Sequence, residues 1–245
     1  MERSDNMSYT AFLSERRAEL LSQIEQAAAR AGRNANEVSL LTVSKTVGTD
    51  EVVLAREAGY RLFGENRPQE LVRKLNALRD MPQMADVRFD MIGNLQKNKI
   101  NQVIGTVGLI HSVSSLHLAE AISKRAEVRG LVERVLLEVN VSGEGSKSGF
   151  SPEAVNAEVE QLMELGGISI EGVMTMAPAN NPDAARRTFS GLREVRDELR
   201  MRTGRPLDVL SCGMSDDFGI AVEEGSTLVR LGRIVFDQGY RLAAR

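Results

Sequence analysis

The feature that most constrains the fold is the alternation of short apolar runs with longer segments of helical periodicity. Eight runs are apolar enough to be buried strands, at 38–44, 60–65, 87–93, 108–113, 134–141, 168–176, 207–214 and 226–236. Between them, segments such as 182–202 repeat apolar residues at spacings of three and four, with Asn181 as the expected N-cap. Strands of this kind, separated by helices, are typical of a parallel sheet that helices cover on both faces.

Eight such units in 245 residues predict a (β/α)8 barrel, or TIM barrel, preceded by one extra helix from about Tyr9 to Ala31 that Gly32 ends. A doubly wound open sheet is the alternative. Its dinucleotide-binding form has a G-x-G-x-x-G turn after the first strand, whereas SKTVGTDE follows here. Because only DQGYRLAAR remains after the eighth run, we expect one domain over 1–245, with 1–8 as a disordered tail.

Composition and charge exclude several classes of function. The net charge is −3 and no basic tract is present, which argues against a nucleic-acid-binding surface. Cys212 is the one cysteine, so it cannot form an internal disulfide, and we expect it to be buried and inert. No Cys/His cluster has metal-ligand spacing, and the first 21 residues contain no uninterrupted apolar stretch. We therefore expect a cytoplasmic protein that binds neither metal nor membrane.

Lys45 ends the first predicted strand, within VSLLTVSKTVG. Residues at the C-terminal ends of barrel strands surround the active site, and Lys45 alone among the six lysines directly ends a strand. Partial burial increases the fraction of an amine that is free to attack a carbonyl, so Lys45 is a candidate for forming a Schiff base. The structural alternative is a rim lysine paired with a carboxylate such as Glu65.

A second candidate site lies in LSCGMSDDFGIAVEEG, which predicts a strand, a glycine-containing turn and a short helix with Ser215 as N-cap. The next run, GSTLVRLGRIVF, places Arg230 and Gly232 near the end of the last strand. Loops after strands seven and eight of a barrel commonly bind phosphate. Ser-Asp-Asp is also an ordinary helix start, and its carboxylates would repel an anion unless they point away. An amine and a phosphate site together suggest a ligand such as pyridoxal phosphate.

Several blocks, in order along nearly the whole chain, resemble one family. They are VSKT, LFGENRPQE, IGNLQKNK, HSV, VNVSGEGSKSGF, GVMTM and LSCGMSDDFGIAVEEGSTLVRLG. The chain resembles the pyridoxal phosphate homeostasis proteins, which are single-domain barrels of the fold-type-III kind, related to the N-terminal half of alanine racemase. The resemblance implies that the cofactor is pyridoxal 5'-phosphate, held as a Schiff base on Lys45.

The same resemblance implies further cofactor contacts. Asn66 would lie beside the ring. Ser215 would bind the phosphate, together with the backbone around Met214. The N–H groups of Gly232 and Arg233 would complete the phosphate cradle. These roles follow from the family pattern alone.

Arg230 matches the arginine that faces the pyridine nitrogen in this fold. Because arginine keeps its proton, the ring nitrogen would stay unprotonated and the ring would be a weaker electron sink. Two positions depart from the pattern: Asp90 replaces the histidine of an H-x-I-G block, and Phe236-Asp237 replaces F-G at a tail position that we expect to be tolerant. We expect His111 to be a structural histidine.

Racemisation in alanine racemase requires two bases, a lysine and a tyrosine. The three tyrosines here are Tyr9, Tyr60 and Tyr240, and none is expected at the end of a barrel strand. We therefore expect a non-catalytic, monomeric carrier that stores, buffers or delivers pyridoxal phosphate, with transient contact to pyridoxal-phosphate-dependent apo-enzymes. The alternatives are a low-activity amino-acid racemase and a Schiff-base aldolase acting on a sugar phosphate. Lys147, in the loop SGEGSKSGF, is the second-choice amine.

Overall fold

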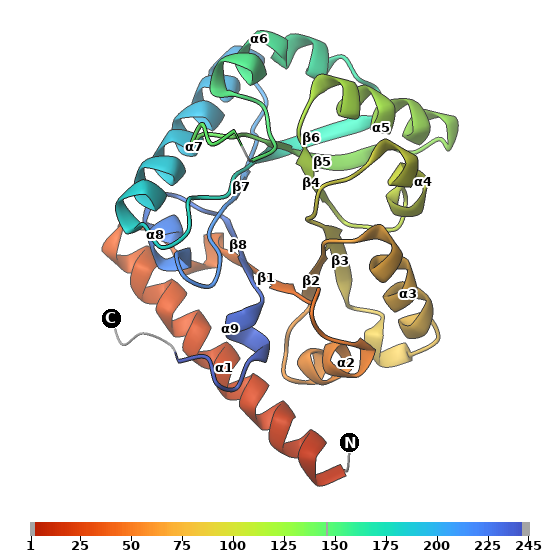
Figure 1. Ribbon diagram of the computed structural model, residues 1–245, viewed down its shortest axis with the longest axis vertical. Helices are drawn as coiled ribbons and strands as arrows, with labels where there is room; N and C mark the ends of the chain where they lie inside the picture. The colour runs from red at the N-terminus through yellow and green to blue at the C-terminus, as the bar shows by residue number, and fades with distance from the viewer. Residues whose placement is uncertain (1–2, 146, 242–245) are drawn as a thin grey trace.

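Eight parallel strands pair in sequence order and close into a barrel through the pairing of β1 with β8 (Figure 1). The computed structural model describes residues 3–145 and 147–241. The strands are β1 Ser39–Val43, β2 Leu62–Glu65, β3 Arg88–Met91, β4 Ile110–Val113, β5 Glu133–Glu138, β6 Ile168–Met174, β7 Val209–Ser211 and β8 Leu228–Leu231. All eight predicted strands and the barrel are confirmed, and the open sheet is excluded.

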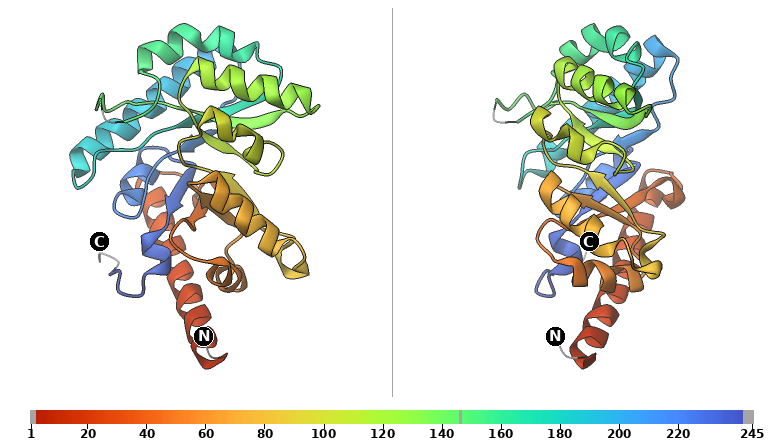
Figure 2. Two further views of the ribbon diagram at one scale, coloured as in Figure 1. Left: turned by 45° about the vertical axis from the view of Figure 1, so that its right-hand side comes forward. Right: turned by 90° about the vertical axis from the view of Figure 1, so that its right-hand side faces the viewer.

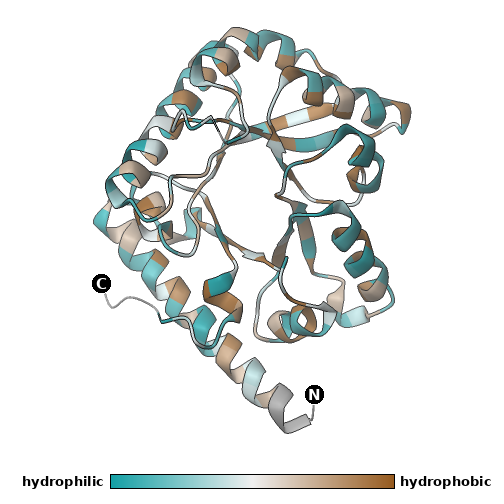
Figure 3. Ribbon diagram, viewed as in Figure 1, coloured by the Kyte–Doolittle hydropathy of each residue, from teal (hydrophilic) through white to brown (hydrophobic). Residues whose placement is uncertain are grey.

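Helices surround the barrel on its outer side (Figure 2). They are α1 Arg3–Arg30, α2 Thr49–Glu57, α3 Pro68–Leu78, α4 Ile100–Val103, α5 Leu116–Val128, α6 Pro152–Met163, α7 Pro182–Thr203, α8 Phe218–Glu223 and α9 Arg233–Phe236. Short 3-10 helices lie at η1 Ala35–Glu37, η2 Pro82–Met84 and η3 Lys97–Lys99. Hydrophobic residues recur along the outer helices between hydrophilic ones (Figure 3), which gives each long helix an apolar side to pack on the strands. Within the described ranges, no helix combines the length and apolarity needed to cross a membrane.

Two helix ends that the sequence predicted are confirmed. Asn181 caps α7, accepting a hydrogen bond from the N–H of Ala184 at 3.0 Å. Gly32 follows α1 with a left-handed φ of 66°. The start of α1 differs, because the helix already begins at Arg3. The expected disordered tail over 1–8 is therefore wrong for residues 3–8, and residues 1–2 lie outside the described part.

The boundaries around the last two strands also differ from the prediction. β8 ends at Leu231, and the apolar residues that follow form α9 instead of more strand. A short apolar run does not by itself distinguish a buried strand from a buried helix. Ser215 is not an N-cap, because α8 begins at Phe218 with Asp217 at the capping position. The N–H of Met214 donates to Oδ1 of Asp217 at 2.6 Å, which stabilises a turn where the sequence predicted helix.

The interior of the barrel is separate from the main core. The main apolar core lies between strands and helices. Inside the barrel, Leu41, Val43 and Leu228 form one small cluster. Leu109, Leu136 and Met174 form another.

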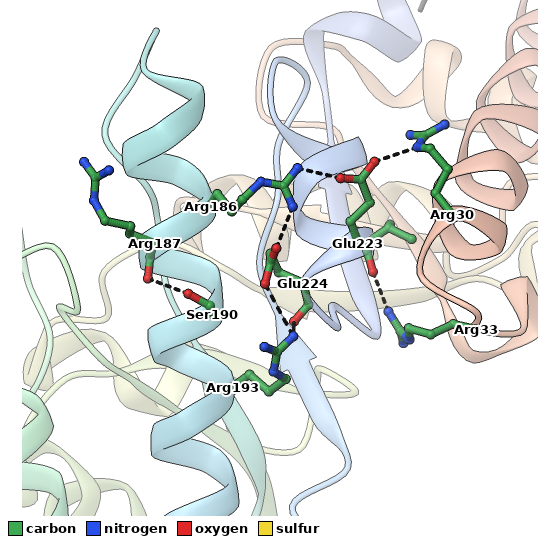
Figure 4. Close-up of polar contacts among 9 residues, drawn as sticks. Arg30, Arg33, Arg186, Arg187, Ser190, Arg193, Glu223 and Glu224 are labelled. Atoms are coloured by element: carbon green, nitrogen blue, oxygen red, sulfur yellow. Dashed lines mark hydrogen bonds and ion pairs between the residues drawn. The ribbon is translucent and has the colours of Figure 1, made fainter.

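A set of ion pairs attaches α1 to the barrel (Figure 4). Glu223 on α8 accepts from Arg30 of α1 at 2.7 Å and from Arg186 of α7 at 2.6 Å. Glu224 accepts from Arg186 at 2.6 Å, and its backbone carbonyl accepts from Arg193 at 2.8 Å. The end of α8 therefore connects the extra helix to the outer helical layer.

α1 also holds the chain segment that follows β8. The guanidinium of Arg16 donates to the carbonyls of Ile234 and Tyr240, the latter at 3.0 Å. The hydroxyl of Tyr9 donates to the carbonyl of Phe236 at 2.9 Å. Arg16 is buried, with 7% exposure, so these contacts are shielded from water.

Candidate ligand-binding site

A pocket of about 660 Å³ opens at the C-terminal ends of β1, β7 and β8. This volume is typical of small-molecule sites, which span roughly 300–1,000 Å³. Its lining is Val43, Lys45, Thr46, Val47, Met214, Ser215, Asp216, Arg230, Gly232, Arg233, Phe236 and Asp237. Six of the seven predicted cofactor-binding residues therefore lie around one pocket, and Asn66 does not.

Lys45 lies in a turn that directly follows β1 and contributes an amine to the pocket. Its side chain is exposed, so the predicted partial burial is wrong. The alternative pairing of Lys45 with Glu65 is also wrong, because Glu65 binds the ammonium of Lys74 at 2.5 Å. The amine in the pocket is therefore free of this carboxylate.

Backbone and hydroxyl groups gather on the opposite wall, around the start of α9. The N–H of Ile234 donates to Oγ of Ser215 at 3.4 Å. Gly232 precedes α9, and the first N–H groups of a helix have no partner within it. Such groups favour an anion, as the predicted phosphate cradle requires.

The two carboxylates that directly follow Ser215 are already engaged. Asp216 forms an ion pair with Arg233 at 2.7 Å and accepts from the hydroxyl of Tyr240 at 2.5 Å. Asp217 accepts from the N–H of Met214 and does not line the pocket. The repulsion that the sequence Ser-Asp-Asp suggested is therefore reduced, since each carboxylate points toward a donor.

Arg230 lies at the bottom of the pocket with 5% exposure. Its guanidinium donates to Oγ of Ser211 at 2.6 Å and to the carbonyl of Thr175 at 2.9 Å. Burial lowers the pKa of Arg230, while nearby acidic groups including Glu138 oppose that shift. Burial in turn raises the pKa of Glu138, and Arg230 counteracts this. The pocket therefore has a fixed, buried cation at its base.

A hydrogen-bonded chain extends from Arg230 across the barrel interior. Oγ of Ser211 lies 3.1 Å from Nδ1 of His111, and Nε2 of His111 lies 3.3 Å from Oδ2 of Asp90. Arginine can only donate and an ionised carboxylate can only accept. Burial lowers the pKa of His111, which favours the neutral ring, and in that form Nε2 donates to Asp90 while Nδ1 accepts from Ser211.

This chain gives Asp90 a structural context that the sequence did not reveal. Asp90 has no measurable exposure, and its departure from the family pattern places a carboxylate beside His111 inside the barrel. His111 is a hydrogen-bonded structural histidine, as expected, and is absent from the pocket lining within the described residues. Ser211 was missed. Polar residues inside otherwise apolar strands were the signal that could have identified it.

Asn66 lies in a different pocket of about 210 Å³. This smaller pocket is lined by Asn66, Arg67, Pro68, Gln69, Asn94, Gln96 and Lys99. Asn66 follows β2, so it is at the correct end of the barrel, but it lines a different pocket from Lys45. Its predicted place beside a ring stays a prediction.

Three other segments of the chain lie in or away from the main pocket in ways that the sequence did not predict. Phe236 and Asp237 line the main pocket, so this position is part of the site and not only of a tail. Tyr240 reaches the rim, where its hydroxyl also donates to the carbonyl of Ser215 at 3.3 Å. Lys147 contacts the carbonyl of Met176 at 3.2 Å and forms an ion pair with Glu144, away from the main pocket lining.

Cys212 is fully buried just after β7. Burial raises the pKa of its thiol to about 12. A thiol in this state has almost no reactive thiolate at neutral pH, which agrees with the inert role that the sequence predicted.

Comparison with known proteins agrees with this architecture. The family model described as the alanine racemase N-terminal domain matches residues 18–238. A pyridoxal phosphate homeostasis protein of Aquifex aeolicus is 42% identical over 225 residues, which cover 91% of this chain and 97% of that protein. The one from Vibrio cholerae is 36% identical, with 89% and 93% covered.

Solved structures give the same result. PipY of Synechococcus elongatus, crystallised with PLP bound, is 33% identical with a TM-score of 0.81, and the match covers 91% of this chain and 99% of PipY. An alanine racemase of Clostridium difficile has a TM-score of 0.69 at 16% identity and supports the fold alone. The match spans 97% of this chain but 58% of that racemase.

Proposed function

Because the chain belongs to the family of pyridoxal phosphate homeostasis proteins, we propose that it binds pyridoxal 5'-phosphate with Lys45 as the point of covalent attachment. The observation that carries this proposal is that Lys45, Arg230 and the start of α9 line the same pocket. An aldehyde, a pyridine nitrogen and a phosphate on one ligand would each meet a matching group there. PipY, at 33% identity, was crystallised with PLP.

Attachment requires the neutral amine of Lys45. That amine would hold the cofactor through its aldehyde, with one water released on attachment. A bound ring would also exclude water from the exposed side chain of Lys45. Attachment of this kind would be reversible by water, as storage and delivery require.

The rest of the pocket fixes the orientation of the ligand. The phosphate would contact Ser215, the backbone near Met214, and the N–H groups of Gly232 and Arg233. Arg230 would face the ring nitrogen and keep it unprotonated, since a guanidinium retains its protons. When bound, the cofactor supplies an electron sink for carbanions, and an unprotonated nitrogen weakens that sink.

We further propose that the protein is a carrier that stores, buffers or delivers the cofactor without strong catalysis of its own. Among the described residues, Lys45 is the single amine in the pocket lining, and no tyrosine is included. Tyr240, at the rim, directs its hydroxyl to Asp216. Racemisation in alanine racemase uses a lysine and a tyrosine, and the described part of this lining includes a lysine without a tyrosine.

The attachment point is tested by reductive trapping. We expect the loaded protein to be yellow, to lose its visible band on borohydride reduction, and to carry the adduct on Lys45. Lys45→Ala should abolish the reducible linkage, whereas Lys147→Ala, the matched control amine, should leave the chromophore in place. An adduct on another lysine would contradict the proposal. A colourless protein that traps a ketose phosphate would indicate the aldolase instead.

The carrier role is tested by two further assays. Turnover of a panel of amino acids should be absent or very slow, and sustained racemisation at ordinary enzyme rates would establish the racemase alternative. Loaded protein should reactivate a pyridoxal-phosphate-dependent apo-enzyme through transient contact. We also propose that the carrier is a cytoplasmic monomer. Light scattering and cell fractionation test these two points.

A further inference from the structure

The buried lysine near the end of β1 is Lys74, not Lys45. Lys74 is on α3 with 1% exposure, next to Glu65 at the end of β2, also with 1% exposure. Burying an ammonium and a carboxylate together gives little or no net stability, and apolar replacements of similar volume are often neutral or stabilising. The stability of the fold therefore gives no sufficient reason for this pair.

The pair holds the residue that precedes Lys45. The Nζ of Lys74 donates to the carbonyl of Ser44 at 2.6 Å. Oγ of Ser44 donates to Oε1 of Glu65 at 2.6 Å, and its N–H donates to the carbonyl of Gly64 at 3.0 Å. All three polar groups of Ser44 are thus bonded, two of them to the buried ion pair.

The carbonyl of Ser44 also closes the turn that contains Lys45. It accepts from the N–H of Val47 at 3.2 Å, so Lys45 and Thr46 occupy the two central positions of that turn. One oxygen therefore serves both the turn and Lys74. In the described part of the chain, the pocket lining includes neither Ser44, Glu65 nor Lys74. The turn is consequently held from outside the pocket.

We propose that Lys74 and Glu65 are positioning residues that set the place of Lys45 for Schiff-base formation. The inference rests on the proposed function of Lys45. Reactive groups must be held within roughly 0.5 Å of their productive position, and a displacement of about 1 Å can reduce reactivity about a hundredfold. The side chain of Lys45 is exposed, so its position depends on its backbone, which this cluster fixes.

The test uses the double variant Lys74→Met/Glu65→Leu, which removes both charges together and leaves no unpaired ion. Two ligands are compared: pyridoxal phosphate, and pyridoxine phosphate, which carries an alcohol instead of the aldehyde and cannot form the imine. We expect the double variant to bind pyridoxine phosphate as the parent protein does. The additional affinity for pyridoxal phosphate should fall about tenfold or more.

A purely structural role would weaken the binding of both ligands equally, or neither, and either result would overturn the proposal. Arg73→Gln/Glu70→Gln is the matched control, because this exposed pair lies on the same helix with its atoms 2.9 Å apart. It should change neither affinity. If the parent protein forms no imine on Lys45, the proposed function fails. If it does and the ratio of affinities is unchanged in the double variant, only this inference fails.

Ser44→Ala decides the matter should the double variant not fold. It leaves the ion pair intact and removes one of the three bonds that hold Ser44. We expect the affinity ratio to fall roughly threefold, since the carbonyl contact with Lys74 remains. An unchanged ratio in this variant would refute the positioning role.

Discussion

His111 connects Asp90 to Ser211 inside the barrel, and both of its ring nitrogens have partners. A protonated ring would have two donors, so Nδ1 could no longer accept from Ser211. Burial is the main cause that lowers the pKa of His111 below 6.5, and Asp90 opposes it. Protonation would therefore disrupt the chain that ends at Arg230.

This pKa shift predicts a pH dependence of stability. The unfolded chain takes up a proton near pH 6.5, whereas folded His111 resists it until lower pH. The contribution of His111 to the free energy of unfolding is therefore complete above pH 6.5. It is lost as the pH falls below that value, with a slope of at most about 1.4 kcal/mol per pH unit.

Urea unfolding of the ligand-free protein between pH 5 and 8 would measure this dependence. His111→Gln should have a shallower decline than the parent protein. His117→Gln is the matched control, because His117 is on the surface of α5 with 76% of its side chain exposed, and it should follow the parent curve. Parallel curves for His111→Gln and the parent would contradict the prediction.

At the residue scale, position was easier to predict than environment. Lys45 was identified from its place after a strand, and it does line the pocket. Its exposure was not predictable, because a sequence does not show which lysine a distant carboxylate will pair with. Glu65 pairs with Lys74 nine positions later, and Asp90 meets His111 only because neighbouring strands place them together.

At the element scale, the turn from β7 to α8 determines one wall of the pocket. Gly213 has a φ of 93°, and a Cβ there would lie 2.6 Å from Cβ of Ala221. Its carbonyl accepts from the N–H of Arg230 at 3.0 Å. The turn therefore requires a glycine at position 213. Through the same bond, the turn that carries Met214 and Ser215 is attached to the backbone of Arg230.

Gly213→Ala should destabilise the protein and weaken ligand binding. A left-handed conformation costs a residue with a side chain about 1–2 kcal/mol, and the contact with Ala221 adds to this. We expect unfolding free energy to fall by about 2 kcal/mol or more, and affinity for pyridoxal phosphate to fall with it. Gly145→Ala, where a Cβ would meet nothing within 4 Å, should change both by little. Equal effects of the two substitutions would exclude this explanation.

Strands were predictable and short helices were not. Each apolar run contains a strand because β-branched and aliphatic residues in a parallel sheet are buried on both faces. The segment Arg233–Phe236 is just as apolar, yet it is helical, because Val235 and Phe236 donate to the carbonyl of Gly232 and not to a strand. Local hydrophobicity does not determine that choice of partner.

At the scale of the whole molecule, α1 contacts the chain segment after β8 that forms one wall of the pocket. Arg16 and Tyr9 bond to carbonyls of the segment after β8, and Phe236 within that segment lines the pocket. Contacts between the first helix and the last residues are thus part of the wall that would hold the phosphate. The sequence predicted the extra helix but gave no indication of this support.

Arg16→Gln should therefore reduce ligand affinity several-fold and lower the unfolding free energy by about 2 kcal/mol, since buried carbonyls lose a charged donor. Titration with pyridoxal phosphate and urea unfolding would measure the two effects. Arg30→Gln, on the same helix but half exposed in its ion pair with Glu223, should cost less than about 1 kcal/mol and leave affinity unchanged. An unaltered affinity in Arg16→Gln would show that α1 does not support the site.

The pocket lies where the sheet closes, with Lys45 after the first strand and Gly232 after the last. A chain still being synthesised can present the amine early, but the pocket wall that includes Gly232 is incomplete until β8 has left the ribosome. Loading with cofactor would therefore distinguish a finished molecule from a nascent one. A bound ligand would also join the two ends of the sheet, so it should slow the separation of β1 from β8 when the protein unfolds.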